Sequence, residues 1–176
     1  MFNKAKFYFE WIYIIKYYFK SINKPVRRFE IYMPLFISVT YAIIYLKNNQ
    51  LKLALDNFSS ILPNVLSILI GFTITILMIM PSITEKIEKI KKNRDDKLNP
   101  FLQLLSQFSF NVFSELILLC LIFVYMSFSG FKINMSIYIL FAFFIIELFL
   151  LLNILFSTIR GITNIFLLFS SLEKKK

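Results

Sequence analysis

A single carboxylate within a very apolar stretch is the residue with the most evident chemical potential in this chain. Glu147 lies in "YILFAFFIIELFLLLNILF", residues 138–156. If this stretch crosses a bilayer, an ionised acid at its centre costs at least about 2.5–3.5 kcal/mol. Since no Lys or Arg lies deep in an apolar segment, we expect a protonated acid that donates a hydrogen bond. The candidate partners, judged by depth, are Ser38, Thr40, the Gly71 carbonyl, Thr75 and the region of Cys120.

Three roles for Glu147 follow from this placement. The acid could relay a proton or cation, it could form a ring of acids in an oligomer, or it could fasten helices through a hydrogen bond worth under about 2 kcal/mol. Fastening is the preferred interpretation, because one acid does not make a pathway. Among the other polar residues in the apolar segments, we single out Glu115, Asn111 and Asn153 as candidates for a role in the membrane.

Other kinds of chemistry find little support in the composition. The chain has no histidine and one cysteine, Cys120. Histidine-dependent acid–base catalysis and a Cys/His metal site are therefore excluded. Asp95 and Asp96 are adjacent, but a metal site needs more ligands. We expect no catalytic residue, no metal and no cofactor, and hence not an enzyme.

The elements that must position these polar residues are membrane-spanning helices. Hydrophobic residues make up 58% of 176, and Phe alone occurs 22 times. A chain of this size has too little interior to bury so many apolar side chains. Each apolar stretch matches the roughly 20 residues that a bilayer core requires. The sequence predicts an all-α integral membrane protein with four spans, at residues 29–46, 61–81, 109–130 and 134–159.

The distribution of basic residues predicts the orientation. Segments 1–28, 82–100 and 160–176 hold seventeen of the 20 Lys and Arg residues, and the two other connections hold three. The positive-inside rule then places both termini and the charged loop or helix at 82–100 in the cytoplasm, with residues 160–176 as a tail. We predict a bacterial inner-membrane protein. The net charge of +10 has the same explanation, so direct nucleic-acid binding is not expected.

The first 28 residues are predicted to form an amphipathic helix at the membrane surface. Lys16, Lys20 and Lys24 share one side, and aromatic and aliphatic residues share the other. Such a helix places its lysines toward anionic headgroups. In the 82–100 segment, Lys89 and Lys92 lie on a predicted helix that could contact lipid or a soluble protein. In both segments a plain membrane anchor or solvated hairpin is the alternative to a docking site.

A stripe of small residues predicts helix packing in the second span. Ser67, Gly71 and Thr75 recur every four residues, the spacing that allows two helix backbones to approach closely in lipid. The pattern does not distinguish a neighbour in the same chain from a second subunit. We expect a homo-oligomer, or the membrane half of a complex with a cytosolic protein.

The second span and its flank carry a resemblance to known proteins. "LSILIGFTITILMIMPSI" followed by "TEKIEKIKK" resembles small four-span proteins of bacterial anti-phage systems, such as the membrane subunit of the Kiwa system and the membrane accessory proteins of type VI-B RNA-guided systems. The resemblance covers residues 29–160 in layout and the second span in motif. It implies a membrane sensor, effector or regulator that acts with a cytosolic nuclease. The alternatives are a small ion- or proton-linked channel or transporter using Glu147, and a membrane anchor or scaffold.

Overall fold

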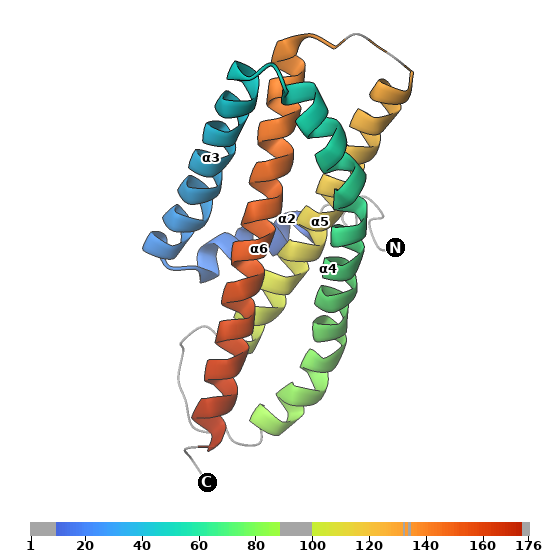
Figure 1. The fold of residues 1–176 in the computed structure, drawn as a ribbon. Helices are drawn as coiled ribbons and strands as arrows, with labels where there is room; N and C mark the ends of the chain where they lie inside the picture. The colour runs from blue at the N-terminus through green and yellow to red at the C-terminus, as the bar shows by residue number, and fades with distance from the viewer. Residues whose placement is uncertain (1–9, 89–99, 132, 134, 174–176) are drawn as a thin grey trace.

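All regular structure in the described part of the chain is helical. The structure is a computed structural model that describes residues 10–88, 100–131, 133 and 135–173. The five helices, shown in Figure 1, are α2 (Glu10–Ser21), α3 (Lys24–Lys47), α4 (Leu51–Glu88), α5 (Pro100–Gly130) and α6 (Ile137–Glu173). The last four are long and apolar enough to cross a membrane. The predicted all-α, four-span architecture is thus confirmed at this level.

The four long helices alternate in direction, so the bundle has two distinct ends (Figure 1). The hairpin end carries the α3–α4 turn and the α5–α6 connection, and the opposite end, called the α2 end here, lies on the side of α2. At the α3–α4 turn Asn49 adopts a positive φ of 54°, which Asn tolerates better than most residues. The Gln50 amide donates to the Tyr45 carbonyl at 3.0 Å. Only three residues therefore separate α3 from α4.

All four of the long helices are longer than the predicted spans. At 1.5 Å per residue, α4 and α6 rise more than about 50 Å, against about 30 Å of hydrocarbon core. At the hairpin end α4 begins at Leu51 rather than near residue 61. At the other end it continues through Pro81 to Glu88, and α6 continues past Arg160 to Glu173. Figure 1 shows α4, α5 and α6 extending beyond both α2 and the nearby end of α3.

A seven-residue repeat of buried positions joins α4, α5 and α6 into one core. Residues seven apart share a helix face in coiled-coil packing, where each side chain inserts between residues of the facing helix. The repeat carries polar as well as apolar side chains. Its members are Ser59, Leu66, Thr73 and Met80 in α4; Leu104, Asn111, Leu118 and Tyr125, with Phe108, Glu115 and Ile122, in α5; and Leu140, Glu147 and Ile154 in α6.

α3 packs against α6 through a seam of small residues. Pro34, Ser38 and Ala42 recur every four residues and are buried. Small side chains at this spacing let two helix backbones approach closely. The predicted stripe on α4 is different, because Ser67, Gly71 and Thr75 are all exposed. Within the described residues, no atom of another helix lies within 4 Å of a Cβ built at Gly71. The close intramolecular seam is on α3, where the sequence analysis did not look for one.

α2 crosses the bundle and packs mainly against α5. Tyr18 of α2 and Ile22, which directly follows the helix, are buried, so part of the apolar face predicted to enter lipid instead contacts protein. Asn23 lies between α2 and α3, and Pro25 stands in the first turn of α3, a position where a missing N–H costs nothing. The predicted location of residues 1–28 at the membrane surface stays a prediction.

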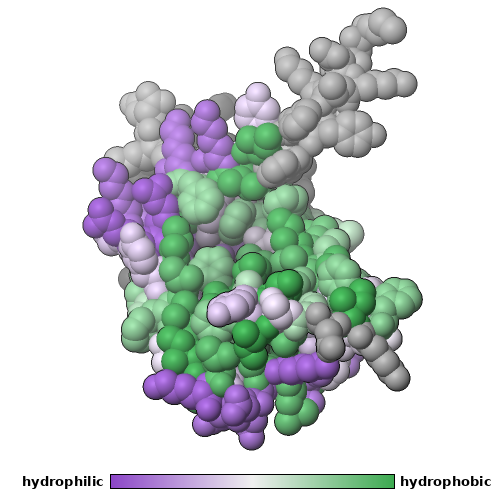
Figure 2. Space-filling model, turned by 90° about the horizontal axis from the view of Figure 1, so that it is seen from above, coloured by the Kyte–Doolittle hydropathy of each residue, from purple (hydrophilic) through white to green (hydrophobic). Residues whose placement is uncertain are grey.

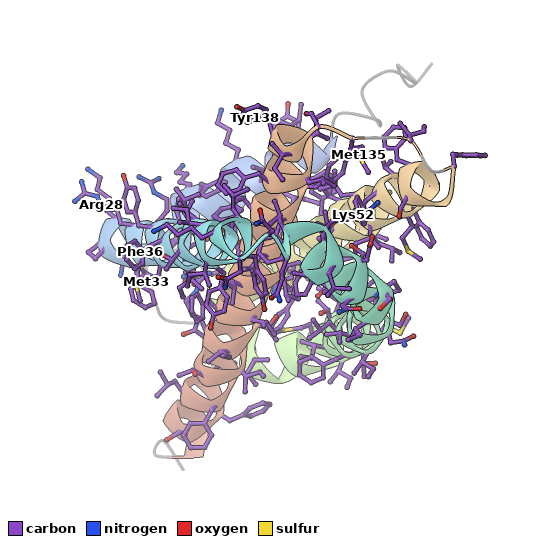
Figure 3. The ribbon with its side chains drawn as sticks, turned by 45° about the horizontal axis from the view of Figure 1, so that its top comes forward. Arg28, Met33, Phe36, Lys52, Met135 and Tyr138 are labelled. Carbon is purple, nitrogen blue, oxygen red and sulfur yellow. The ribbon has the colours of Figure 1, made fainter. Side chains whose placement is uncertain are left out.

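The outer faces of the bundle are apolar. Figure 3 shows Met33 and Phe36 projecting outward from α3, and they are 40% and 70% exposed. Figure 2 looks down on the hairpin end, where hydrophobic residues cover the middle of the view and hydrophilic ones gather in patches toward its edge. Continuous exposure of large apolar side chains is expected of a surface that faces lipid rather than water.

Candidate functional site

Glu147 is completely buried in the bundle and bonded to α4. The Ser59 hydroxyl donates to Glu147 Oε2 at 3.1 Å. The second carboxyl oxygen, Oε1, has no hydrogen-bond partner among the described residues. The acid does bond to a neighbouring helix, but it accepts this hydrogen bond rather than donating it, and the partners expected from depth were wrong.

The reason for that error is the start of α4. Ser59 was left outside the predicted second span, whereas α4 begins at Leu51 and places Ser59 on its buried face. The hydroxyls predicted as partners bond within their own helices instead. Ser38 donates to the Pro34 carbonyl and Thr75 to the Gly71 carbonyl, each at 2.7 Å.

Glu115 repeats the arrangement of Glu147 nearer the α2 end. It is also fully buried, and the Thr73 hydroxyl of α4 donates to its Oε1 at 3.1 Å. Its Oε2 lacks a hydrogen-bond partner within the described part of the chain. Each membrane acid is therefore held by one hydroxyl of α4 and keeps one free oxygen.

An apolar layer separates the two acids. Their α4 partners, Ser59 and Thr73, are fourteen residues apart, which corresponds to a rise of about 21 Å. Between them lies a cluster formed by all three core helices: Leu62, Leu66, Leu118, Ile122 and Ile154. The two carboxyls thus occupy separate polar layers, and the arrangement favours helix fastening over a proton path through one chain.

Two amides extend the Glu115 layer toward the α2 end. Asn111 Nδ2 donates to Thr158 Oγ1 at 3.1 Å, and Gln107 donates to the Ser157 carbonyl. Gln107, Asn111 and Glu115 recur every four residues and therefore line one side of α5. Sequence reasoning selected the last two and missed Gln107, although this spacing could have revealed it.

Gly161 allows α5 and α6 to approach closely beside these amides. A Cβ built at this position would lie 2.6 Å from Phe108 Cζ and 3.2 Å from Gln107 Nε2. Phe108 is fully buried, so its ring has little room to move. Any larger side chain at residue 161 would force the two helices apart.

The most extensive polar cluster joins α2, α3 and α6, and we call it the three-helix junction. Arg160 Nε lies 2.6 Å from Glu30 Oε1, an ion pair whose N–H direction falls short of a well-formed hydrogen bond. Arg160 Nη2 donates to the Tyr18 hydroxyl at 3.2 Å, and that hydroxyl donates to Glu30 Oε2 at 3.2 Å. Asn153 Nδ2 adds a bond to the Glu30 carbonyl at 2.8 Å.

Sequence analysis missed this junction, because Glu30 was assigned no role and α2 was placed in the headgroup layer. Tyr18 completes it by stacking on Phe110 of α5, with ring centroids 4.0 Å apart. Burial, and then the nearby charge of Glu30, raises the pKa of the Tyr18 phenol from 10.0 to about 12. The hydroxyl is therefore protonated at neutral pH and able to donate to the carboxylate.

A smaller polar contact closes the hairpin end. Tyr125 donates to Asp56, and Ser129 donates to the same carboxylate oxygen at 3.4 Å. This contact ties the first turns of α4 to the last turns of α5.

The predicted contact residues are distributed as follows. Lys16, Lys20 and Lys24 are exposed at the α2 end, as a role in lipid or partner contact would require. Lys89 and Lys92 lie outside the described residues. In the part of the chain that the structure describes, no group of three His, Cys, Asp or Glu side chains could hold a metal ion.

Comparison with family profiles, with curated proteins and with solved structures gave no match to this chain.

Proposed function

We propose that this chain is a non-enzymatic membrane component of a bacterial anti-phage defence system, acting as a sensor, effector or regulator together with a cytosolic nuclease. The proposal combines the resemblance of the second span with the shape of the bundle. It places the protein in the inner membrane with both termini and the α2 end in the cytoplasm, in accord with the positions of the lysines and arginines.

The observation that carries the proposal is the extension of α4, α5 and α6 past α2 and the nearby end of α3 (Figure 1). Arg160 bonds to Tyr18 of α2 and to Glu30 of α3, and α6 continues for thirteen more residues. That extension presents Ile162, Phe166 and Leu167, which are 46–69% exposed. Under the proposed topology this segment lies on the cytoplasmic side of the membrane, where exposed apolar residues are typical of a contact surface for another protein.

A deletion strain tests the biological role. If the proposal is right, the strain loses resistance to at least one phage, and resistance returns with the wild-type gene but not with a Phe166→Ser, Leu167→Ser variant. Thr163→Ser is the matched control, since Thr163 is exposed on the same segment and bonds only within its helix. Unchanged resistance in the deletion strain across a broad phage panel would remove the defence role.

Pull-down from membranes tests the partner separately. Wild-type protein should retain a nuclease encoded beside it, and the Phe166→Ser, Leu167→Ser variant should not. If the variant still retains the nuclease, the contact lies on another surface. The next variant would then replace the basic segment 82–98 with a neutral linker.

One observation favours a second function, a small oligomeric channel or transporter for protons or cations. Glu147 and Glu115 are fully buried, and each has one oxygen without a hydrogen-bond partner among the described residues. Buried acids in membranes commonly serve ion pathways. In liposomes, Glu147→Gln should abolish ion flux if this function is correct. Glu115→Gln provides the matched comparison, and flux unchanged by both substitutions would exclude this second function.

A further inference from the structure

A groove of about 490 Å³ runs between α2 and α5 at the α2 end of the bundle. Its volume lies in the range of pockets that hold small ligands. The described lining combines an apolar wall, two aromatic hydroxyls, two serines and two cations: Tyr13, Ile14, Lys16, Tyr17, Lys20, Leu105, Ser106 and Ser109.

The charges in the groove select an anionic ligand. Lys16 and Lys20 are four residues apart and so neighbour each other on one side of α2. Both are exposed, and the lining residues that the structure describes include no acid. Two ammonium groups beside an apolar wall match a phosphate that is joined to hydrocarbon. A free inorganic ion fits less well, because it has no apolar part that could contact the wall.

The position of the groove also fits a lipid. Ser109 lies near the α2 end of the α5 segment that can span a membrane, so the groove opens where headgroups meet acyl chains. Tyr13 is 68% exposed at its rim. Tyrosine is enriched at this depth because its ring is apolar and its hydroxyl can remain hydrated.

The groove exists before any ligand binds, because α2 is attached to the bundle on both sides of it. Tyr18 stacks on Phe110, and Gln103 Nε2 donates to the Ser21 carbonyl at 3.0 Å. On its other side α2 is held through the three-helix junction, where the Tyr18 hydroxyl bonds to Glu30 and Arg160. A lipid would therefore enter a formed site and would not have to order α2 itself.

We propose that this groove binds one anionic diacyl phospholipid, with Lys16 and Lys20 on the phosphate and an acyl chain against Ile14 and Leu105. The site goes beyond general attraction of lysines to a charged membrane, since it requires both the cations and the space between the helices. It does not depend on a defence role for the protein.

Native mass spectrometry of the full chain tests this site with phosphatidylglycerol and phosphatidylcholine as probes. One phosphatidylglycerol should remain bound per chain, and phosphatidylcholine should dissociate. Lys16→Gln with Lys20→Gln should weaken phosphatidylglycerol binding by about tenfold or more, from the loss of two charges at the membrane surface. Lys24→Gln is the control, because Lys24 is exposed at the same end but does not line the groove.

A second variant tests the space in the groove separately from the charge of the two lysines. Ser109→Phe fills the space and keeps both lysines, so it should also lose the lipid; Ser109→Leu serves the same purpose if the larger side chain impairs folding. Equal binding of the two lipids, equal loss with Lys24→Gln, or wild-type binding by a correctly folded Ser109 variant would overturn the proposal. Displacement of the lipid by millimolar inorganic phosphate would also overturn it, since it would indicate a simple anion site.

Discussion

The ion pair between Glu30 and Arg160 should be essential to the bundle even though the pair adds little net stability. The Glu30 side chain is 6% exposed and that of Arg160 is 17% exposed. At their separation of 2.6 Å, two unit charges attract by about 6 kcal/mol in a medium of effective dielectric constant about 20. Removing each ion from water costs several kcal/mol, so attraction and desolvation nearly cancel.

Loss of one partner upsets this balance. Arg160→Met leaves Glu30 buried with only the Tyr18 hydroxyl beside it, and should lower the free energy of unfolding by about 3–5 kcal/mol. Glu30→Leu should cost a similar amount, because Arg160 is then unpaired. The double variant removes both charges, and we expect it to recover at least about 2 kcal/mol relative to the sum of the single losses.

Unfolding by SDS titration in mixed micelles, followed by circular dichroism, measures these free energies. Arg28→Met is the matched control: Arg28 is exposed on the same helix as Glu30, and its replacement should change the free energy by less than about 0.5 kcal/mol. Strictly additive losses in the double variant would refute the reasoning, because they would mean that the two charges do not interact.

Four further results are expected. Tyr18 should ionise near pH 12 rather than 10, seen as the part of the tyrosinate absorbance that the wild type shows and Tyr18→Phe lacks. The part of the free energy of unfolding that depends on the protonated Tyr18 phenol should decline from pH 10 to 12. Gly161→Val should destabilise the bundle by more than about 2 kcal/mol in the SDS titration, because no space exists for the new side chain. Ser59→Ala should cost under about 2 kcal/mol by the same assay, the range for one interhelical hydrogen bond to an acid such as Glu147. Gly71→Leu should leave the monomer as stable as the wild type, since this face contacts no other described helix, and a large loss would contradict its exposure.

Hydropathy alone predicted the all-helical class and the four helices that are long and apolar enough to cross a membrane. Hydropathy is a local property: an apolar run of about 20 residues predicts a membrane helix wherever the rest of the chain lies. The energetic cost of burying an acid could also be predicted locally, because Glu147 has no charged residue near it in the sequence. This cost led to the prediction that Glu147 forms a hydrogen bond with another helix.

Only the tertiary structure decided which residues meet. Glu147 bonds to Ser59 and Arg160 pairs with Glu30, across 88 and 130 residues of chain. Such pairs depend on the rotation and relative depth of helices, which follow from side-chain packing and not from the hydropathy of any segment. The Ser67–Gly71–Thr75 stripe shows the limit of pattern alone: its spacing permits close packing, but the seven-residue repeat of α4 turns another face, with Ser59 and Thr73, toward the core.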